Sequence, residues 1–170
     1  MDEDAKKTAL RMIPYGIYVA TADDGDGNIA AATVNWVTQT AFAPPLLVMG
    51  VKTDSGLYAV IGKSRQFVLN MLGKGQQGLA FTFFKPAEVA DGTISGEAYA
   101  PGAATGAPVL ASAPAHVECK VVEIVEQGDH HIVVGEVIGA GGGEPPGWGA
   151  GGAKRGGEGR GVLVLLGGGF

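Results

Sequence analysis

Residues 30–72 decide the fold of this chain and read AAATVNWVTQTAFAPPLLVMGVKTDSGLYAVIGKSRQFVLNML. Hydroxyl and amide side chains are frequent in residues 33–39, and this stretch runs towards Pro44 and Pro45, which end it. A fully apolar run follows, and the tetrapeptide KTDS at residues 52–55 then precedes a helical pattern. This order predicts a polar strand, a buried strand and a capped helix in succession.

The polar strand carries side chains that suit a planar ligand able to form hydrogen bonds. Side chains alternate between the two faces of a strand. One face would carry Thr33, Asn35, Val37 and Gln39, and the other would carry Val34, Trp36 and Thr38. A buried face with these groups needs hydrogen-bond partners, which the edge of a flavin ring supplies. The alternative is a sheet face that water solvates.

The segment KTDS lies where the buried strand meets the start of the helix. Free N–H groups and the positive end of a helix favour a phosphate at such a place. Thr53 and Ser55 offer hydroxyls, Asp54 lies between them, and Lys52 offers a positive charge. Together with the polar strand, the segment suits a phosphorylated flavin such as FMN. The alternative is an ordinary helix cap beside a surface lysine.

The rest of the chain predicts short strands with a few helices. We expect strands at residues 15–22, 29–41, 46–51, 66–72, 115–126, 131–140 and 162–166, helices at 2–12, 56–62 and 76–84, and a loop at 91–108. Ala9, Leu10 and Met12 should pack the first helix against the rest of the protein. Hairpin spacing, rather than regular alternation of strands and helices, favours an antiparallel barrel or sandwich with peripheral helices.

Composition excludes several classes of protein. A chain of 170 residues with 46% hydrophobic and 17% charged residues is expected to form one globular domain over residues 1–170. The formal net charge of -5 and scattered basic residues argue against nucleic-acid binding. The charged N-terminus has no apolar core of a secretion signal, no apolar run is long enough to span a membrane, and Cys119 is the one cysteine. We therefore expect a cytoplasmic protein without membrane contact.

Glycine is concentrated near the C-terminus, where 14 of the 30 glycines lie between Gly141 and Phe170. Ordering so many glycines into regular structure costs much backbone entropy. We expect residues 141–159 to form a mobile loop within the single domain. No GxxxxGK[ST] loop is present, and Gly25-Asp26-Gly27 looks like a hairpin rather than a dinucleotide-binding turn.

The turn Gly128-Asp129-His130-His131 precedes a second strong strand pattern. His130 could donate or accept a hydrogen bond beside a redox-active ring, and Asp129 could orient it. The alternative is a polar turn without a ligand. Beyond His130 and His131, His116 is the only other histidine, and with a single cysteine this predicts no metal site.

Taken together, these segments resemble the flavin reductase-like family of FMN-binding split barrels. The resemblance rests on TVNWVTQTAFAPP (residues 33–45), KTDS (52–55), QFVLNML (66–72), Cys119 with Lys120, and GDHHIVVGEV (128–137). It implies a mainly β fold, a Greek-key split β-barrel with a few peripheral helices. It further implies a homodimer with FMN bound near the subunit interface and NADH or NADPH as co-substrate.

The resemblance also assigns residues to the flavin. Residues 33–39 would line the ring and ribityl chain, residues 52–55 would hold the phosphate, and Asn70 and Lys85 would make further flavin contacts. His130 would be the catalytic residue, beside the flavin and the nicotinamide. The implied activity is reduction of flavin by NAD(P)H, with electrons passed to free flavin or a partner. An FMN-binding electron-transfer protein without efficient NAD(P)H turnover is the alternative.

Overall fold

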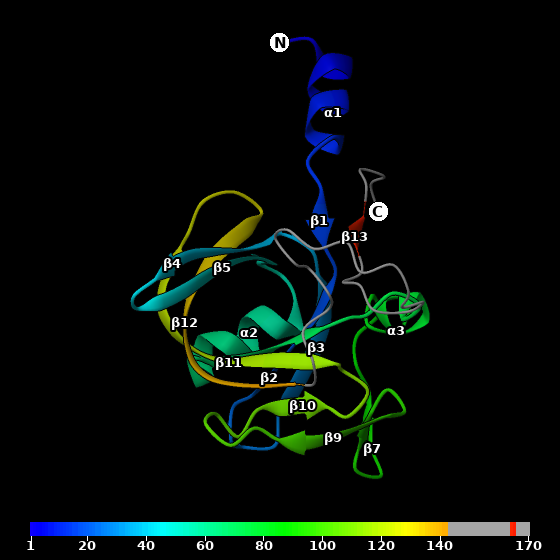
Figure 1. Ribbon diagram of the computed structural model, residues 1–170, viewed down its shortest axis with the longest axis vertical. Coiled ribbons are helices and arrows are strands. Elements are labelled where there is room, and N and C mark those ends of the chain that lie inside the picture. The colour runs from blue at the N-terminus through cyan, green and yellow to red at the C-terminus, as the bar shows by residue number, and fades with distance from the viewer. Residues whose placement is uncertain (143–163, 166–170) are drawn as a thin grey trace, which may run out of the picture.

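The computed structural model describes residues 1–142 and 164–165, and its main element is an antiparallel sheet of seven strands in the order β3-β2-β6-β11-β12-β5-β4 (Figure 1). The elements are α1 (Glu3–Arg11), β1 (Tyr15–Gly16), β2 (Tyr18–Asp23), β3 (Ile29–Val34), β4 (Val37–Phe42), β5 (Pro45–Lys52), α2 (Gly56–Ser64), β6 (Gln66–Met71), α3 (Gln77–Thr82), β7 (Val89–Ala90), β8 (Thr93–Ile94), β9 (Glu97–Pro101), β10 (Pro108–Leu110), β11 (Ala115–Val125), β12 (His130–Gly142) and β13 (Val164–Leu165). The predicted mainly β class with few helices is confirmed.

The large sheet curls but stays open, because β3 and β4 form its two edges and no described strand joins them. The predicted single strand over residues 29–41 is wrong, since the chain leaves β3 after Val34 and begins β4 at Val37. Between them, the N–H of Val37 donates to the carbonyl of Asn35 in a tight turn. Asn35 and Trp36 therefore carry the chain from one edge of the sheet to the other.

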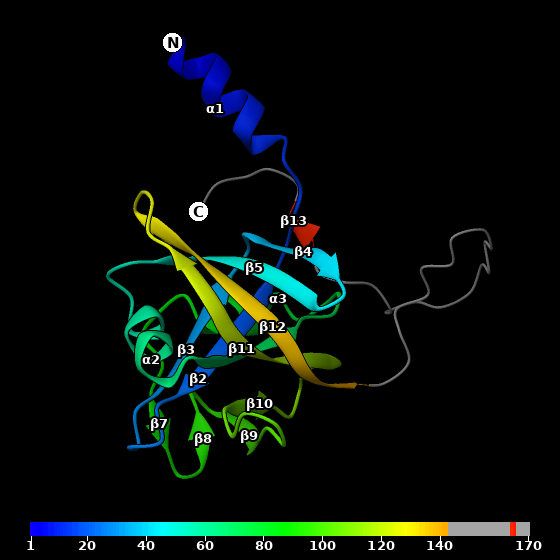
Figure 2. The same ribbon diagram turned by 90° about the vertical axis from the view of Figure 1, so that its left-hand side faces the viewer.

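A fully buried apolar core fills the curl of the sheet. Met49, Phe67 and Val133 come from three different strands, and α2 adds Ile61 as it packs against one end of the sheet (Figure 2). The ring of Phe67 occupies space that only a glycine leaves open on β12, because a Cβ at Gly135 would lie 2.7 Å from Phe67 Cζ. The fully apolar run at residues 46–51, which predicts a buried strand, contributes Leu47, Met49 and Val51 to this core.

A second, smaller sheet of order β10-β9-β8-β7 lies beside the first. The prediction of a loop over residues 91–108 is wrong in this respect. These strands are too short for their apolar residues to form a recognisable alternating pattern in the sequence. Gly92 and Gly96 supply the left-handed backbone of the tight turns between them (φ +73° and +83°). Ile94 and Leu110 from this sheet pack with Phe83 in a separate core cluster.

Glu118 holds the turn between β9 and β10 against β11. Its buried carboxylate accepts hydrogen bonds from the N–H of Ala104 (3.0 Å), the N–H of Thr105 (2.8 Å) and the hydroxyl of Thr105 (2.8 Å). Burial alone would raise the pKa of Glu118, but these donors and the nearby His116 outweigh it and hold the pKa below its ordinary value. The charged carboxylate therefore stabilises the folded state.

Replacing Glu118 by glutamine should lower the free energy of unfolding at neutral pH by about 1–2 kcal/mol. A depressed pKa contributes stability above the ordinary glutamate pKa of about 4.3, and that contribution disappears as the pH falls through the lowered folded-state value. The difference between wild type and Glu118→Gln should accordingly shrink in acid. Urea unfolding between neutral pH and pH ~3 measures this; a difference that stays constant across that range contradicts the assignment.

Helix α1 forms as predicted, but it packs against nothing in the described protein. The carboxylate of Asp2 caps it by accepting from the N–H groups of Asp4 and Ala5, so local interactions suffice to define it. No residue of α1 is buried, Leu10 is 54% and Met12 is 79% exposed, and the helix extends away from the sheet (Figure 1). The expected packing of Ala9, Leu10 and Met12 is therefore not found among the residues that the structure describes.

The C-terminal predictions are tested in part. Strand β12 continues through Gly141 to Gly142, so the expected loop cannot begin at residue 141. The rest of that predicted loop, residues 143–159, lies outside the described residues. The predicted last strand is present as β13, where Val164 pairs with Gly16 and Leu165 pairs with Tyr15 of β1.

Candidate functional site

An aromatic cavity of about 560 Å³ lies where the chain crosses between the two edges of the sheet. We call it the aromatic cavity. It is lined by Ile13, Pro14, Tyr15, Trp36, Val37, Thr38, Val48, Gly50, Asp129, His130 and Ile132. Its walls are mostly apolar, with Thr38, Asp129 and His130 among its polar groups, which is the usual character of a site for a planar organic ligand.

Trp36 lies directly on the backbone of β5. The N–H of Gly50 donates to the Trp36 carbonyl at 2.8 Å, and a Cβ at position 50 would lie 3.2 Å from Trp36 Cε3. A larger residue at position 50 would therefore push the indole a few tenths of an ångström away from the strand. The His130 ring packs edge-on against this indole, with 4.7 Å between ring centroids, and the Tyr15 ring is 6.5 Å away on the other side. The three rings form one aromatic cluster.

The position of His130 follows from the pleat of the sheet. His130 pairs with Lys52 and Ile132 pairs with Gly50, so these four residues share one face of the β5–β12 pair. His131 pairs with buried Val51 on the opposite face. The sequence alone does not say which of two adjacent histidines faces the cavity, whereas the register assigns that position to His130.

Asp129 and His130 form a hydrogen-bonded pair at the rim of the aromatic cavity, with Asp129 exposed and His130 half-buried. His130 Nδ1 lies 3.0 Å from Asp129 Oδ1. The hydrogen bond from His130, and then its charge, lower the pKa of the Asp129 carboxyl below its ordinary value. Asp129 is thus a carboxylate at neutral pH, and it gives this rim a negative charge.

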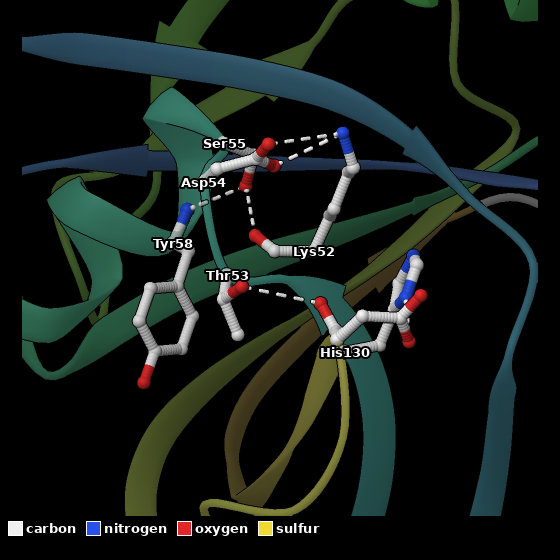
Figure 3. Close-up of polar contacts among 7 residues, drawn as sticks. Lys52, Thr53, Asp54, Ser55, Tyr58 and His130 are labelled. Carbon is white, nitrogen blue, oxygen red and sulfur yellow. Dashed lines mark hydrogen bonds and ion pairs between the residues drawn. The ribbon is translucent and has the colours of Figure 1, made fainter.

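A second cavity, of about 420 Å³, lies at the start of α2, and we call it the α2 cavity. It is lined by Ile29, Ala30, Ala31, Ala32, Lys52, Asp54, Ser55, Gly56, Leu57, Phe83, Phe84, Lys85, Pro86 and Ala87. Two lysines from distant parts of the chain, Lys52 and Lys85, line this cavity. Lys52 Nζ lies 3.1 Å from both carboxylate oxygens of Asp54 (Figure 3).

The first turn of α2 adds backbone donors to this cavity. The Ser55 side chain caps the helix by accepting from the N–H of Tyr58 at 3.1 Å, and its hydroxyl donates to the carbonyl of Lys52 at 2.7 Å (Figure 3). The N–H groups of Gly56 and Leu57 have no carbonyl partner within the helix. Two lysines and a helix N-terminus make the α2 cavity suitable for a phosphate.

The structure brings together eight of the residues that the sequence singled out. Trp36, Val37, Thr38 and His130 line the aromatic cavity, and Lys52, Asp54, Ser55 and Lys85 line the α2 cavity. Thr53 lies between the two groups, and its hydroxyl donates to the carbonyl of Asp129 at 3.2 Å rather than pointing freely into the α2 cavity.

The other selected residues lie elsewhere. Val34 is buried in the core, the Thr33 hydroxyl donates to the Ala80 carbonyl, and Gln39 lines a third, apolar cavity on the inner side of the sheet. Asn35 is half-buried in the turn between β3 and β4 and lines neither cavity. The predicted shared face of Thr33, Asn35, Val37 and Gln39 does not exist, because that turn separates the two strands.

Asn70 requires a correction, because it is fully buried and so cannot contact a flavin ring. Its side-chain amide donates to the Val19 carbonyl (3.1 Å) and the Thr21 hydroxyl (3.2 Å), and its Oδ1 accepts from the N–H of Leu110 (2.9 Å). These bonds join β6 to β2 and to the small sheet. We therefore assign Asn70 a structural role.

Sequence reasoning did not select Gly50, Tyr15 or residues 30–32 as site residues, and the structure places all of them on the cavity walls. A glycine inside an apolar strand can signal a close approach by another group, and Gly50 is such a case. The alanines carry no such signal, because their contribution is the small side chain that leaves the α2 cavity open beside β3.

Within residues 1–142 and 164–165, no three or more histidine, cysteine, aspartate or glutamate side chains gather closely enough to hold a metal ion. No helix in that part of the chain combines the length and apolar character needed to cross a membrane.

The described residues form a mainly β protein, in which an open antiparallel sheet carries an aromatic cavity and a second cavity at the start of α2. The family model described as "Flavin reductase like domain" matches residues 10–151, and the chain belongs to this family. The resemblance inferred from the motifs is thereby confirmed.

Several characterised proteins are similar to this chain. It is 32% identical to flavin reductase (NADH) of Kitasatospora aureofaciens over 146 residues, which cover 85% of this chain and 74% of that protein. It is 30% identical to NADH:FMN oxidoreductase of Rhodococcus qingshengii, covering 77% of this chain and 66% of that protein.

Among solved structures, the NADH:FAD oxidoreductase SgcE6 of Streptomyces globisporus C-1027 superimposes with a TM-score of 0.75 at 27% identity, covering 98% of this chain and 84% of that one. The same oxidoreductase in complex with NAD and FAD fragments gives a TM-score of 0.74, with 26% identity over 98% of this chain and 89% of that one.

Proposed function

We propose that this protein is an NADH-dependent flavin reductase that binds FMN across the aromatic cavity and the α2 cavity. The observation that supports this most is their arrangement around one short segment. Lys52 ends β5 at the α2 cavity, and its strand partner His130 lines the aromatic cavity. A ligand with a phosphate at one end and a ring at the other would contact both.

The residues present fit FMN in charge and in shape. Lys52, Lys85 and the first N–H groups of α2 would hold the phosphate, while Trp36, Val37 and Thr38 would contact the ring. FMN supplies the ability to accept a hydride from a reduced nicotinamide. The protein binds and orients both molecules, and the apolar walls of the aromatic cavity exclude water.

NADH is the proposed reductant, in preference to NADPH. No lysine or arginine is among the described residues that line the aromatic cavity, and Asp129 places a negative charge at its rim. A 2′-phosphate brought to this rim would meet repulsion rather than a cation. The names of the two curated relatives, both NADH-linked, support the same choice.

The test of the proposed function begins with an absorbance titration of the purified protein with FMN. Binding of FMN, followed by oxidation of NADH at 340 nm when both are present, is the expected result. The competing function is an FMN-binding electron-transfer protein: bound FMN would then be reduced by dithionite but not by NADH. Protein that neither contains nor takes up FMN contradicts both functions.

Replacing His130 by alanine should slow flavin reduction by NADH about 3- to 10-fold while FMN affinity changes less than 2-fold. The substitution removes the ring that packs on Trp36 and a hydrogen-bonding group beside the cavity. Stopped-flow reduction of bound FMN measures the rate. His130→Gln, which keeps a hydrogen-bonding group, should retain more of the rate, and unchanged reduction by His130→Ala would leave His130 as a turn residue.

We also propose that the protein functions as a homodimer. Leu10, Met12 and Ile13 present apolar side chains on and after α1, and Phe42 is 88% exposed at the tip of the β4–β5 hairpin. Strand β4 is also an edge of the large sheet. Such apolar surface and an open edge are typical of a subunit interface. Light scattering coupled to gel filtration tests this; a monomer at micromolar concentration contradicts it.

A further inference from the structure

We propose that Thr53 and Tyr58 are positioning residues that fasten His130 to the segment that binds the flavin phosphate. This inference rests on the proposed function. It assigns these two side chains to the geometry of the NADH side of the site, although both belong to the chain segment at the phosphate side.

The first link lies immediately before His130. The carbonyl of Asp129 accepts two hydrogen bonds from one residue, from the N–H of Thr53 at 3.1 Å and from its hydroxyl at 3.2 Å (Figure 3). The hydroxyl of Thr53 is thereby engaged with the turn between β11 and β12. Residues 126–129 of this turn belong to neither strand, and Gly128 within it has a left-handed backbone (φ +79°), so strand pairing does not fix the turn itself.

The second link lies immediately after His130. The hydroxyl of Tyr58 and Nδ1 of His131 are 2.7 Å apart, and their rings meet edge-on with 5.3 Å between centroids. Both side chains are half-buried, so this bond is shielded from water more than the exposed contacts around it. Tyr58 also donates its N–H to the Ser55 side chain that caps α2.

The two links therefore hold His130 from both sides in sequence. Both links begin at side chains in residues 53–58. The N–H groups of this segment, together with the neighbouring Lys52, would contact the phosphate. A phosphate that orders this segment also orders Asp129 and His131, and with them the ring of His130 on Trp36. The flavin phosphate would then lower the KM for NADH, in addition to raising the affinity for flavin.

The test uses Thr53→Val, which removes the hydroxyl but keeps the N–H bond, together with Tyr58→Phe. Because one hydrogen bond changes an equilibrium roughly 2- to 10-fold, the double variant should raise KM for NADH by about 5-fold. FMN affinity should change less than 2-fold, and the melting temperature should stay close to that of wild type. Thr53→Ser should restore wild-type behaviour, and Tyr99→Phe, on β9, is a matched control.

A second readout does not depend on turnover. Hydrogen exchange of a peptide spanning residues 127–134 should be slowed by FMN more than by riboflavin in the wild type, and this difference should be lost in the double variant. A loss of FMN affinity equal to the rise in KM would make Thr53 a phosphate ligand and overturn the proposal. Unchanged KM and exchange in the variants would also overturn it.

These outcomes separate the two proposals. Wild-type protein that does not bind FMN or oxidise NADH contradicts the proposed function itself. Wild-type protein that does both, with variants indistinguishable from it, contradicts only the role of Thr53 and Tyr58.

Discussion

Replacing Asn70 by alanine should lower the free energy of unfolding by about 2–4 kcal/mol, without a specific loss of FMN affinity in the protein that remains folded. The side chain is fully buried and makes three hydrogen bonds. Its removal leaves the carbonyl of Val19 and the N–H of Leu110 without this partner in a region that excludes water, and it opens a small cavity. Urea unfolding followed by tryptophan fluorescence measures the change.

Asn35→Ala is the matched control for this prediction. Asn35 is the other asparagine that the sequence assigned to the flavin, but it lies half-buried in the turn between β3 and β4. Its replacement should cost less than about 1 kcal/mol, because it is not part of a buried hydrogen-bond network. If Asn70→Ala is as stable as wild type and instead binds FMN weakly, Asn70 contacts the flavin and the structural role is contradicted.

Replacing Lys52 by alanine should weaken FMN binding roughly 30-fold at low salt and riboflavin binding less than 2-fold. A charge-assisted hydrogen bond to a phosphate contributes about 1.5–3 kcal/mol, and riboflavin has no phosphate to receive it. Lys52 is 60% exposed, so added salt should reduce the difference between the two flavins. Titration of each flavin by fluorescence quenching at two salt concentrations measures it.

Two further variants bracket this result. Asp54→Asn removes the carboxylate that is paired with Lys52 and should strengthen FMN binding about 2- to 3-fold, because the phosphate no longer competes for the lysine. Lys74→Ala changes the net charge equally at an exposed turn outside both cavities and should have little effect. Equal losses of FMN and riboflavin affinity in Lys52→Ala would contradict a phosphate role.

Local chemistry explains which parts of the fold the sequence predicts well. Ser55 caps α2 at the predicted residue, and β5 extends only one residue beyond each end of the strand predicted at residues 46–51. These features depend on neighbours in the sequence, so the pattern contains the information. The small sheet of β7 to β10 is not predicted from the sequence, because its strands of two to five residues acquire their pairing from tertiary contacts.

The candidate site divides in the same way. Lys52, Ser55 and His130 line the two cavities, and the sequence can select them because a charge, a helix cap and a polar turn are visible locally. Asn70 is selected wrongly, since an amide in a strand looks the same whether it faces a ligand or a buried carbonyl. Only the contacts with Val19, Thr21 and Leu110 distinguish the two cases.

The sequence by itself therefore determines the mainly β class, the buried strand and capped helix that follow Pro44, and the chemistry available for a phosphorylated planar ligand. Tertiary structure decides where that chemistry is assembled. The two-residue turn at Asn35 and Trp36 moves the chain between sheet edges, and strand register turns His130, rather than His131, towards the aromatic cavity. The turn depends on the pairing of β3 with β2 and of β4 with β5, and the orientation of His130 depends on its pairing with Lys52, about 80 positions away, which no local pattern encodes.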